Sequence, residues 1–223
     1  MTQEQGPLMA RAHLSVLVVL ELVMGVSLVL LALRGDWAQA AFVGGIMAVC
    51  LVPTLSRRMS VEIPSEVALA AVLFVFASLF LGEVHHWYER YPWWDAALHT
   101  TSGLLLGLLG FIIVYMLNED AAVDLHMRPA FVALFAFFFA VGIGAIWEVF
   151  EFAMDEWFGT NMQPATASDP SGLTDTMQDL IVDTIGAAII SIAGWRYLAH
   201  ARTSRIDNWA KRFIQRNPRL FGD

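Results

Sequence analysis

Three short series of acidic residues, one of them with a histidine, have a spacing that suits a chemical site. In chain order their members are Asp95, His99, Glu148, Glu151, Asp155, Asp175, Asp179 and Asp183. Within each series, neighbouring members are three or four residues apart, and such residues share one face of an α-helix. We therefore expect three polar stripes on three helices.

These residue types predict a metal site or acid–base chemistry. Carboxylate oxygens suit Mg²⁺, Mn²⁺ or Ca²⁺, and an added imidazole widens the choice to Zn²⁺ or iron. We take all eight residues as candidate metal ligands, and Glu148, Glu151 and Asp179 also as candidate catalytic groups. The alternative is structural, because protonated acids can hydrogen-bond neighbouring helices.

Composition indicates an integral membrane protein. The chain has 223 residues, of which 57% are hydrophobic and 15% charged, whereas soluble domains have about 25% charged residues. A net charge of −8 argues against nucleic-acid binding, which needs a basic face. Cys50 is the single cysteine, so an intrachain disulfide framework is excluded.

We expect six membrane-spanning helices, since each needs roughly 20 mostly apolar residues. They run from about His13 to Leu33, Ala38 to Leu55, Glu66 to Gly82, Asp95 to Leu117, Pro129 to Trp157 and Asp175 to His200. The second is short and has Pro53 near its end. The predicted fold class is an all-α, polytopic membrane helical bundle that forms a single domain over residues 1–200.

Basic residues predict that both termini face the cytoplasm. Eleven of the 13 Lys and Arg residues lie at the two ends of the chain or in the second and fourth connections, and cytoplasmic loops carry such an excess. In residues 201–223, apolar residues recur at helical spacing with basic residues between them. This pattern predicts a basic amphipathic tail that lies on anionic lipids. The alternative is a solvated tail whose charges only fix the topology.

On this topology the acidic stripes lie in the outer half of the membrane. That half carries twelve acidic residues against Arg34 and Arg90. Carboxylates at membrane depth without basic partners must take up protons, bind a cation or face water. The segment Gly159–Thr174 is either a lid with Gln163 near its entrance or an ordinary connection. Gly103, Gly107 and Gly110 favour close helix packing.

The combined motifs resemble a known family. They are Tyr91-Pro92-Trp93-Trp94-Asp95-x-x-x-His99-x-x-x-Gly103, Trp147-Glu148-x-x-Glu151 and Asp175-Thr176-x-x-Asp179-x-x-x-Asp183-x-x-Gly186-Ala187. Over about residues 57–195 the chain is similar to the YjdF-like bacterial inner-membrane proteins, a domain of unknown function distantly similar to VanZ-like proteins. The resemblance implies a multi-pass protein of the bacterial cytoplasmic membrane and supplies no reaction.

Three functions remain open from the sequence. The first is a metal-dependent enzyme that acts on a lipid-linked or phosphorylated substrate. The second is a non-enzymatic scaffold or a protein that binds a lipid-like or small-molecule ligand. The third is a cation- or proton-coupled transporter, which the scarcity of acids in the cytoplasmic half disfavours. In each case the lipid bilayer is the expected partner.

Overall fold

The computed structural model describes residues 5–56, 65–119, 127–167 and 169–200. Across those ranges the elements are helices and no strand occurs, which confirms the all-α prediction. The chain divides into two compact units, the first ending at Trp94 and the second beginning at Asp95. The single domain over residues 1–200 stays a prediction, and the predicted tail at 201–223 lies outside the described residues.

The first unit consists of five helical elements. They are α1 (Gln5–Leu33), α2 (Trp37–Ser56), α3 (Ser65–Val75), η1 (Phe76–Val84) and α4 (Trp87–Arg90). α1 and α2 are joined by a tight turn in which Gly35 has φ of 80°, and Asp36 Oδ1 accepts a hydrogen bond from the backbone N–H of Gln39 at 3.1 Å. Asp36 thus caps the start of α2. Met24, Val43 and Phe80 belong to the buried core of this unit.

The third predicted helix differs from expectation in its second half. It continues from α3 into η1, a π-helix of nine residues. Close beside it, the ring of Tyr88 occupies the space that a Cβ on Gly82 would need. A hydropathy pattern does not encode whether a helix has α or π turns.

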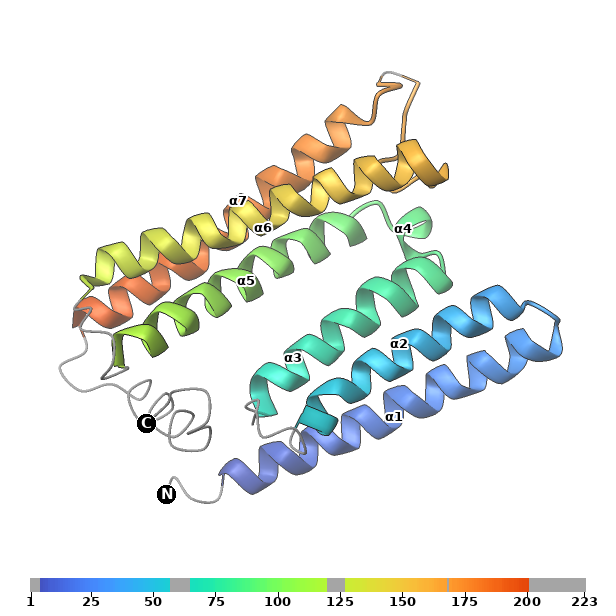
Figure 1. Cartoon of the computed structure of the whole chain (residues 1–223), viewed down its shortest axis with the longest axis horizontal. Coiled ribbons are helices and arrows are strands. Elements are labelled where there is room, and N and C mark those ends of the chain that lie inside the picture. Colours follow the sequence, from blue (N-terminus) through green and yellow to red (C-terminus); the bar gives the residue numbers. More distant parts are fainter. Residues whose placement is uncertain (1–4, 57–64, 120–126, 168, 201–223) are drawn as a thin grey trace. The chain divides into compact units, whose positions relative to one another are not determined.

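The second unit consists of α5 (Trp94–Glu119), α6 (Pro129–Phe158) and α7 (Leu173–His200), which lie side by side in Figure 1. α6 begins with a proline, which suits the first helical position. It ends at Gly159, whose φ of 66° lets the chain leave the helix in the left-handed region. The α6–α7 connection places the end of α6 next to the start of α7.

Glycines let the three helices of the second unit approach closely. A Cβ on Gly103 would overlap the carbonyl oxygen of Asp183, and one on Gly186 would overlap that of Thr100. Gly107 faces the Ile190 side chain in the same way, and a Cβ on Gly110 would lie 2.9 Å from Cα of Ala136. The predicted packing role of Gly103, Gly107 and Gly110 is therefore confirmed.

Five segments among the described residues are long and apolar enough to cross a membrane: His13–Leu33, Glu66–Val84, Trp94–Val114, Pro129–Phe158 and Leu173–Ala199. The second of the six predicted helices is present as α2, but its apolar part, Trp37–Pro53, is shorter. At about 1.5 Å per residue it measures roughly 25 Å, less than the roughly 30 Å hydrocarbon core. The orientation of the termini stays a prediction.

We predict that Gly103→Ala destabilises the protein by about 1–3 kcal/mol, because the added methyl group would force α5 away from α7. Gly142→Ala is the matched control, since nothing lies within 4 Å of a Cβ there. The control should leave stability unchanged or raise it by about 0.5–1 kcal/mol through helix propensity. Unfolding of the detergent-solubilised variants measures both changes, and equal stability of the two variants would contradict the packing argument.

Candidate functional site

The eight residues singled out in the sequence gather at one end of the second unit. Asp95 and His99 lie in the first two turns of α5, and Glu148, Glu151 and Asp155 lie near the end of α6. α7 carries the other three near its start. Because α5 and α7 begin at the end where α6 finishes, the three polar stripes meet at one level.

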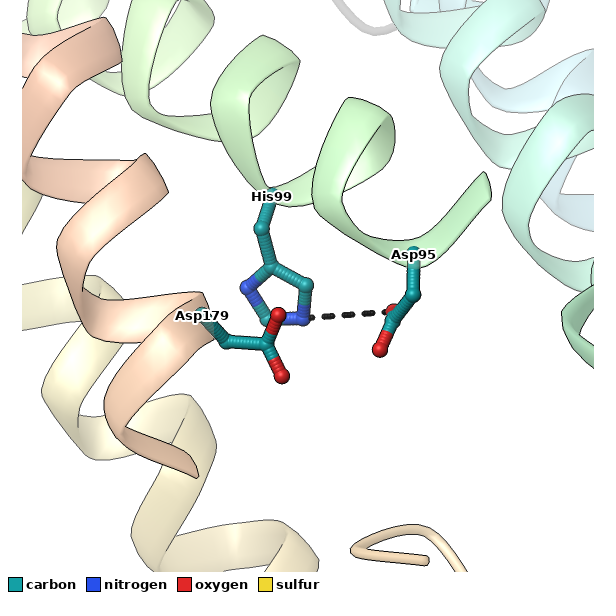
Figure 2. A group of neighbouring side chains, drawn as sticks. All are labelled: Asp95, His99 and Asp179. Atoms are coloured by element: carbon teal, nitrogen blue, oxygen red, sulfur yellow. Dashed lines mark ion pairs between the residues drawn. The ribbon is translucent and has the colours of Figure 1, made fainter. Parts of the chain in front are cut away.

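Three of these residues form a group with the geometry of a metal site. Asp95, His99 and Asp179 each offer one ligand atom, and these atoms all lie within 4.8 Å of one another. Figure 2 shows the carboxyl groups of Asp95 and Asp179 turned toward the same side of the imidazole ring. Two ligands come from α5 and one from α7, so the group exists only because the two helices pack together.

His99 lies at the centre of the acidic side chains. Its Nδ1 is 3.2 Å from Asp183 Oδ2 and 3.9 Å from Glu148 Oε1. Its Nε2 is 3.6 Å from Asp95 Oδ1. The two ring nitrogens therefore face two different sets of carboxylates, one on each side of the ring.

Ser102 is a site residue that the sequence did not single out. Its hydroxyl donates a hydrogen bond to Asp183 Oδ1 at 2.5 Å and lies 2.8 Å from the carbonyl oxygen of His99. The sequence feature that points to Ser102 is its position three residues after His99, which places both on the same helix face. Asp183 thus has a partner for each of its two oxygens.

The polar side chains of the site are buried to an unusual degree. The exposed fractions are 3% for Asp179, 2% for Asp183, 4% for Glu148, 7% for Glu151 and 8% for His99. Within the described part of the chain, no hydrogen bond reaches Asp179 Oδ2, Glu148 Oε1 or Asp175 Oδ2. A buried carboxylate oxygen without a donor is costly, so these three atoms are free to accept a ligand or a proton.

No lysine or arginine among the described residues of the second unit lies at this end. The basic residues there are Arg128, just before α6, and Arg196, near the end of α7. The site lies at the opposite end of both helices, and a helix of 30 residues such as α6 is roughly 45 Å long. Within the described residues of this unit, a bound cation or added protons, on His99 or on the acids themselves, would balance the carboxylates.

Five of the eight predicted ligands are not members of the three-residue metal group, and two of these five, Glu151 and Asp155, have hydrogen-bond partners on α6 or in the loop after it. The indole N–H of Trp147 donates to Glu151 Oε1 at 2.9 Å, one turn away on α6. Asp155 instead holds the α6–α7 connection: its carboxylate accepts hydrogen bonds from the hydroxyl of Thr160 at 2.6 Å and from the backbone N–H groups of Met162 and Gln163 at 2.8 Å. Asp155 therefore shapes the loop.

The loop reaches back between the helices through Gln163. Its side-chain nitrogen donates to Thr176 Oγ1 at 2.7 Å and lies 3.3 Å from the carbonyl oxygen of Glu148. At the far end of the loop, hydrogen bonds from Ser171 and Thr174 hold the pKa of the Asp169 carboxylate below its ordinary value. This interaction is present above the ordinary pKa of aspartate and is lost as the pH falls through the lowered value.

A family model described as "Predicted membrane protein (DUF2238)" matches residues 12–200, which include the whole site. The chain belongs to this family. An uncharacterized protein from Thermotoga maritima is 28% identical over 125 residues, which are 56% of this chain and 59% of that protein. The match thus spans less than two thirds of that relative's length. No solved structure matches the chain significantly.

We predict that Asp155→Ala raises the amide hydrogen-exchange rates of Met162 and Gln163 by at least about tenfold, because each loses a hydrogen bond to a charged acceptor. Glu156→Gln is the matched control, since this neighbouring carboxylate is exposed. It should leave both rates unchanged. Exchange measured by mass spectrometry tests the prediction, and unchanged rates in Asp155→Ala would refute it.

Proposed function

We propose that this protein is a divalent-metal-dependent membrane enzyme, and that Asp95, His99 and Asp179 hold the metal. One observation carries the proposal: the three ligand atoms lie within 4.8 Å of one another. The unpartnered Oδ2 of Asp179 adds support, because it is buried beside His99 and needs a cation or a proton.

The donor set narrows the choice of metal. One imidazole nitrogen and two carboxylate oxygens suit Zn²⁺ or Mn²⁺, and Mg²⁺ is the third candidate. Three protein ligands leave at least one coordination position for water or substrate, as in catalytic rather than structural sites. A metal bound here would supply a Lewis acid and acidify a bound water molecule.

Neighbouring carboxylates supply candidates for proton transfer. Glu148 and Glu151 are both buried beside the metal group, and Glu148 Oε1 accepts no hydrogen bond within the described residues. A buried carboxyl group is suited to act as a general acid or base. Asp179, the third catalytic candidate from the sequence, acts here as a ligand.

Two features, the charge of the site and its place within apolar helices, bear on the proposed substrate class. An anionic group such as a phosphate would be repelled by the bare carboxylates, so it would bind through the metal. A site inside membrane-spanning helices is most readily reached by a molecule with a lipid chain. We therefore assign a lipid-linked or phosphorylated substrate.

The distribution of basic residues supports a bacterial cytoplasmic-membrane location with both termini in the cytoplasm. The site then opens toward the outer leaflet. We retain the kinship to YjdF-like and VanZ-like proteins, and the contact of the tail with anionic lipids, as parts of this proposal.

We predict that the purified wild-type protein retains about one Zn²⁺ or Mn²⁺ ion per chain, and that Asp179→Asn lowers its metal affinity more than about 100-fold. Loss of a residue that only hydrogen-bonds a metal ligand usually costs about 10–100-fold in affinity, so a larger loss indicates that Asp179 is itself a ligand. Glu156→Gln removes an exposed carboxylate and should bind like the wild type. Elemental analysis and competition with a metal indicator measure both quantities, and a wild-type protein that binds neither metal would sink the metal site.

We predict that wild-type protein in vesicles containing a lipid phosphate releases inorganic phosphate, that EDTA stops the release, and that added Mn²⁺ or Zn²⁺ restores it. Asp179→Asn should stay inactive after metal is added, because its site no longer holds the ion. A phosphate assay measures the rates. Metal binding without release from lipid or water-soluble phosphates would favour the non-enzymatic ligand-binding role.

A further inference from the structure

The two nitrogens of His99 differ in what they meet. Nε2 faces the side where the Asp95 and Asp179 carboxyl groups lie. Nδ1 lies 3.2 Å from Asp183 Oδ2. This distance is shorter than those from the ring to Asp95 and to Glu148, which are 3.6 Å and 3.9 Å. A neutral imidazole has one N–H donor and one acceptor nitrogen, so a carboxylate on one side decides which nitrogen carries the hydrogen.

Three helices together build the place of the Asp183 carboxylate. The Ser102 hydroxyl on α5 fixes Oδ1, and the imidazole fixes Oδ2. On α6, Gly144 leaves the necessary room, because a Cβ there would lie 2.6 Å from Asp183 Oδ2. Asp183 is 2% exposed, so its carboxyl group has little freedom to turn elsewhere.

We propose that Asp183 is a positioning residue that holds His99 in the tautomer with hydrogen on Nδ1. The Nδ1–H group donates to Asp183, and the lone pair of Nε2 then points toward Asp95 and Asp179. The carboxylate also makes Nε2 a stronger electron donor and fixes the plane of the ring. This inference rests on the proposed metal site and adds to it the residue that orients its histidine.

The inference separates two aspartates that the sequence treats alike. Asp179 and Asp183 lie one turn apart on α7, and both were predicted to be ligands. Asp179 has an unpartnered oxygen, whereas both oxygens of Asp183 have partners on α5. In this proposal Asp179 is a metal ligand, and Asp183 orients the ligand His99.

The main test is Asp183→Asn, which keeps the side-chain volume and removes the charge. Metal titration of the purified variant should give about one ion per chain with an affinity about 10–100-fold below that of the wild type, the usual cost of losing an outer-shell partner. Loss of the metal as complete as in Asp179→Asn would overturn the inference, because Asp183 would then be a ligand. Wild-type affinity would overturn it as well.

A spectroscopic readout tests the tautomer without any metal. In metal-free wild-type protein labelled with ¹⁵N-histidine, the His99 signals, assigned by their loss in His99→Gln, should show hydrogen on Nδ1. Asp183→Asn should shift the population toward hydrogen on Nε2, because its amide group can donate to Nδ1. A wild-type ring with hydrogen on Nε2 and none on Nδ1 refutes the inference even where metal binds. A wild-type protein that binds no metal but shows the expected tautomer refutes the proposed function alone.

Two further variants keep the inference testable where Asp183→Asn fails to fold. Ser102→Ala removes one partner of Asp183, and Gly144→Ala crowds its carboxylate. Each should weaken metal binding several-fold with the stoichiometry retained. Gly142→Ala is the control on the same helix, because a Cβ there meets nothing within 4 Å, and it should bind like the wild type. Unchanged affinity in both Ser102→Ala and Gly144→Ala would overturn the inference.

Discussion

The backbone contact between α5 and α7 is the constraint on which the site depends. Gly103 lies against the carbonyl oxygen of Asp183, and Gly186 lies against that of Thr100. Since neither glycine has a side chain, the two helices approach at van der Waals distance. Only at that distance can His99 on one helix reach Asp179 and Asp183 on the other, so small residues with no chemistry of their own determine where the chemistry lies.

The same close packing gathers ionisable side chains within helices that are apolar enough to cross a membrane. Ionisable groups at depth are costly, and they are tolerated when they pair or face a cavity. Here the described Lys and Arg residues of the unit lie at its other end, and among the described residues His99 makes the ion-pair contacts to Asp95, Glu148 and Asp183. Oxygens without donors, on Asp179 and Glu148, remain inside an apolar helix unit. The proposed cation site would give these oxygens a partner.

Much of the fold could be predicted from hydropathy, because helices long enough to cross a bilayer leave a continuous apolar signal. α1, α5, α6 and α7 agree with the expected ranges to within a few residues, apart from the start of α1 at Gln5. The π-helical second half of the third expected helix was not predictable, because α and π turns leave the same apolar pattern. Likewise, α2 forms, although its apolar part is short for a spanning helix. Local pattern determines that a helix exists, whereas it does not determine the turn geometry of that helix.

For the site, the sequence by itself determined the residue types, their shared helix faces and their common level, since a regular helix converts spacing into direction and depth. It could not say which of the eight candidates meet as metal ligands, because residues at the same spacing look equivalent before the helices pack. Tertiary structure decided that Asp95, His99 and Asp179 meet, that Asp155 turns to the loop, and that Asp183 contacts Ser102 and the Nδ1 side of His99. The physical reason is that a partner atom on another helix, at hydrogen-bond distance, is a property of packing rather than of either helix alone.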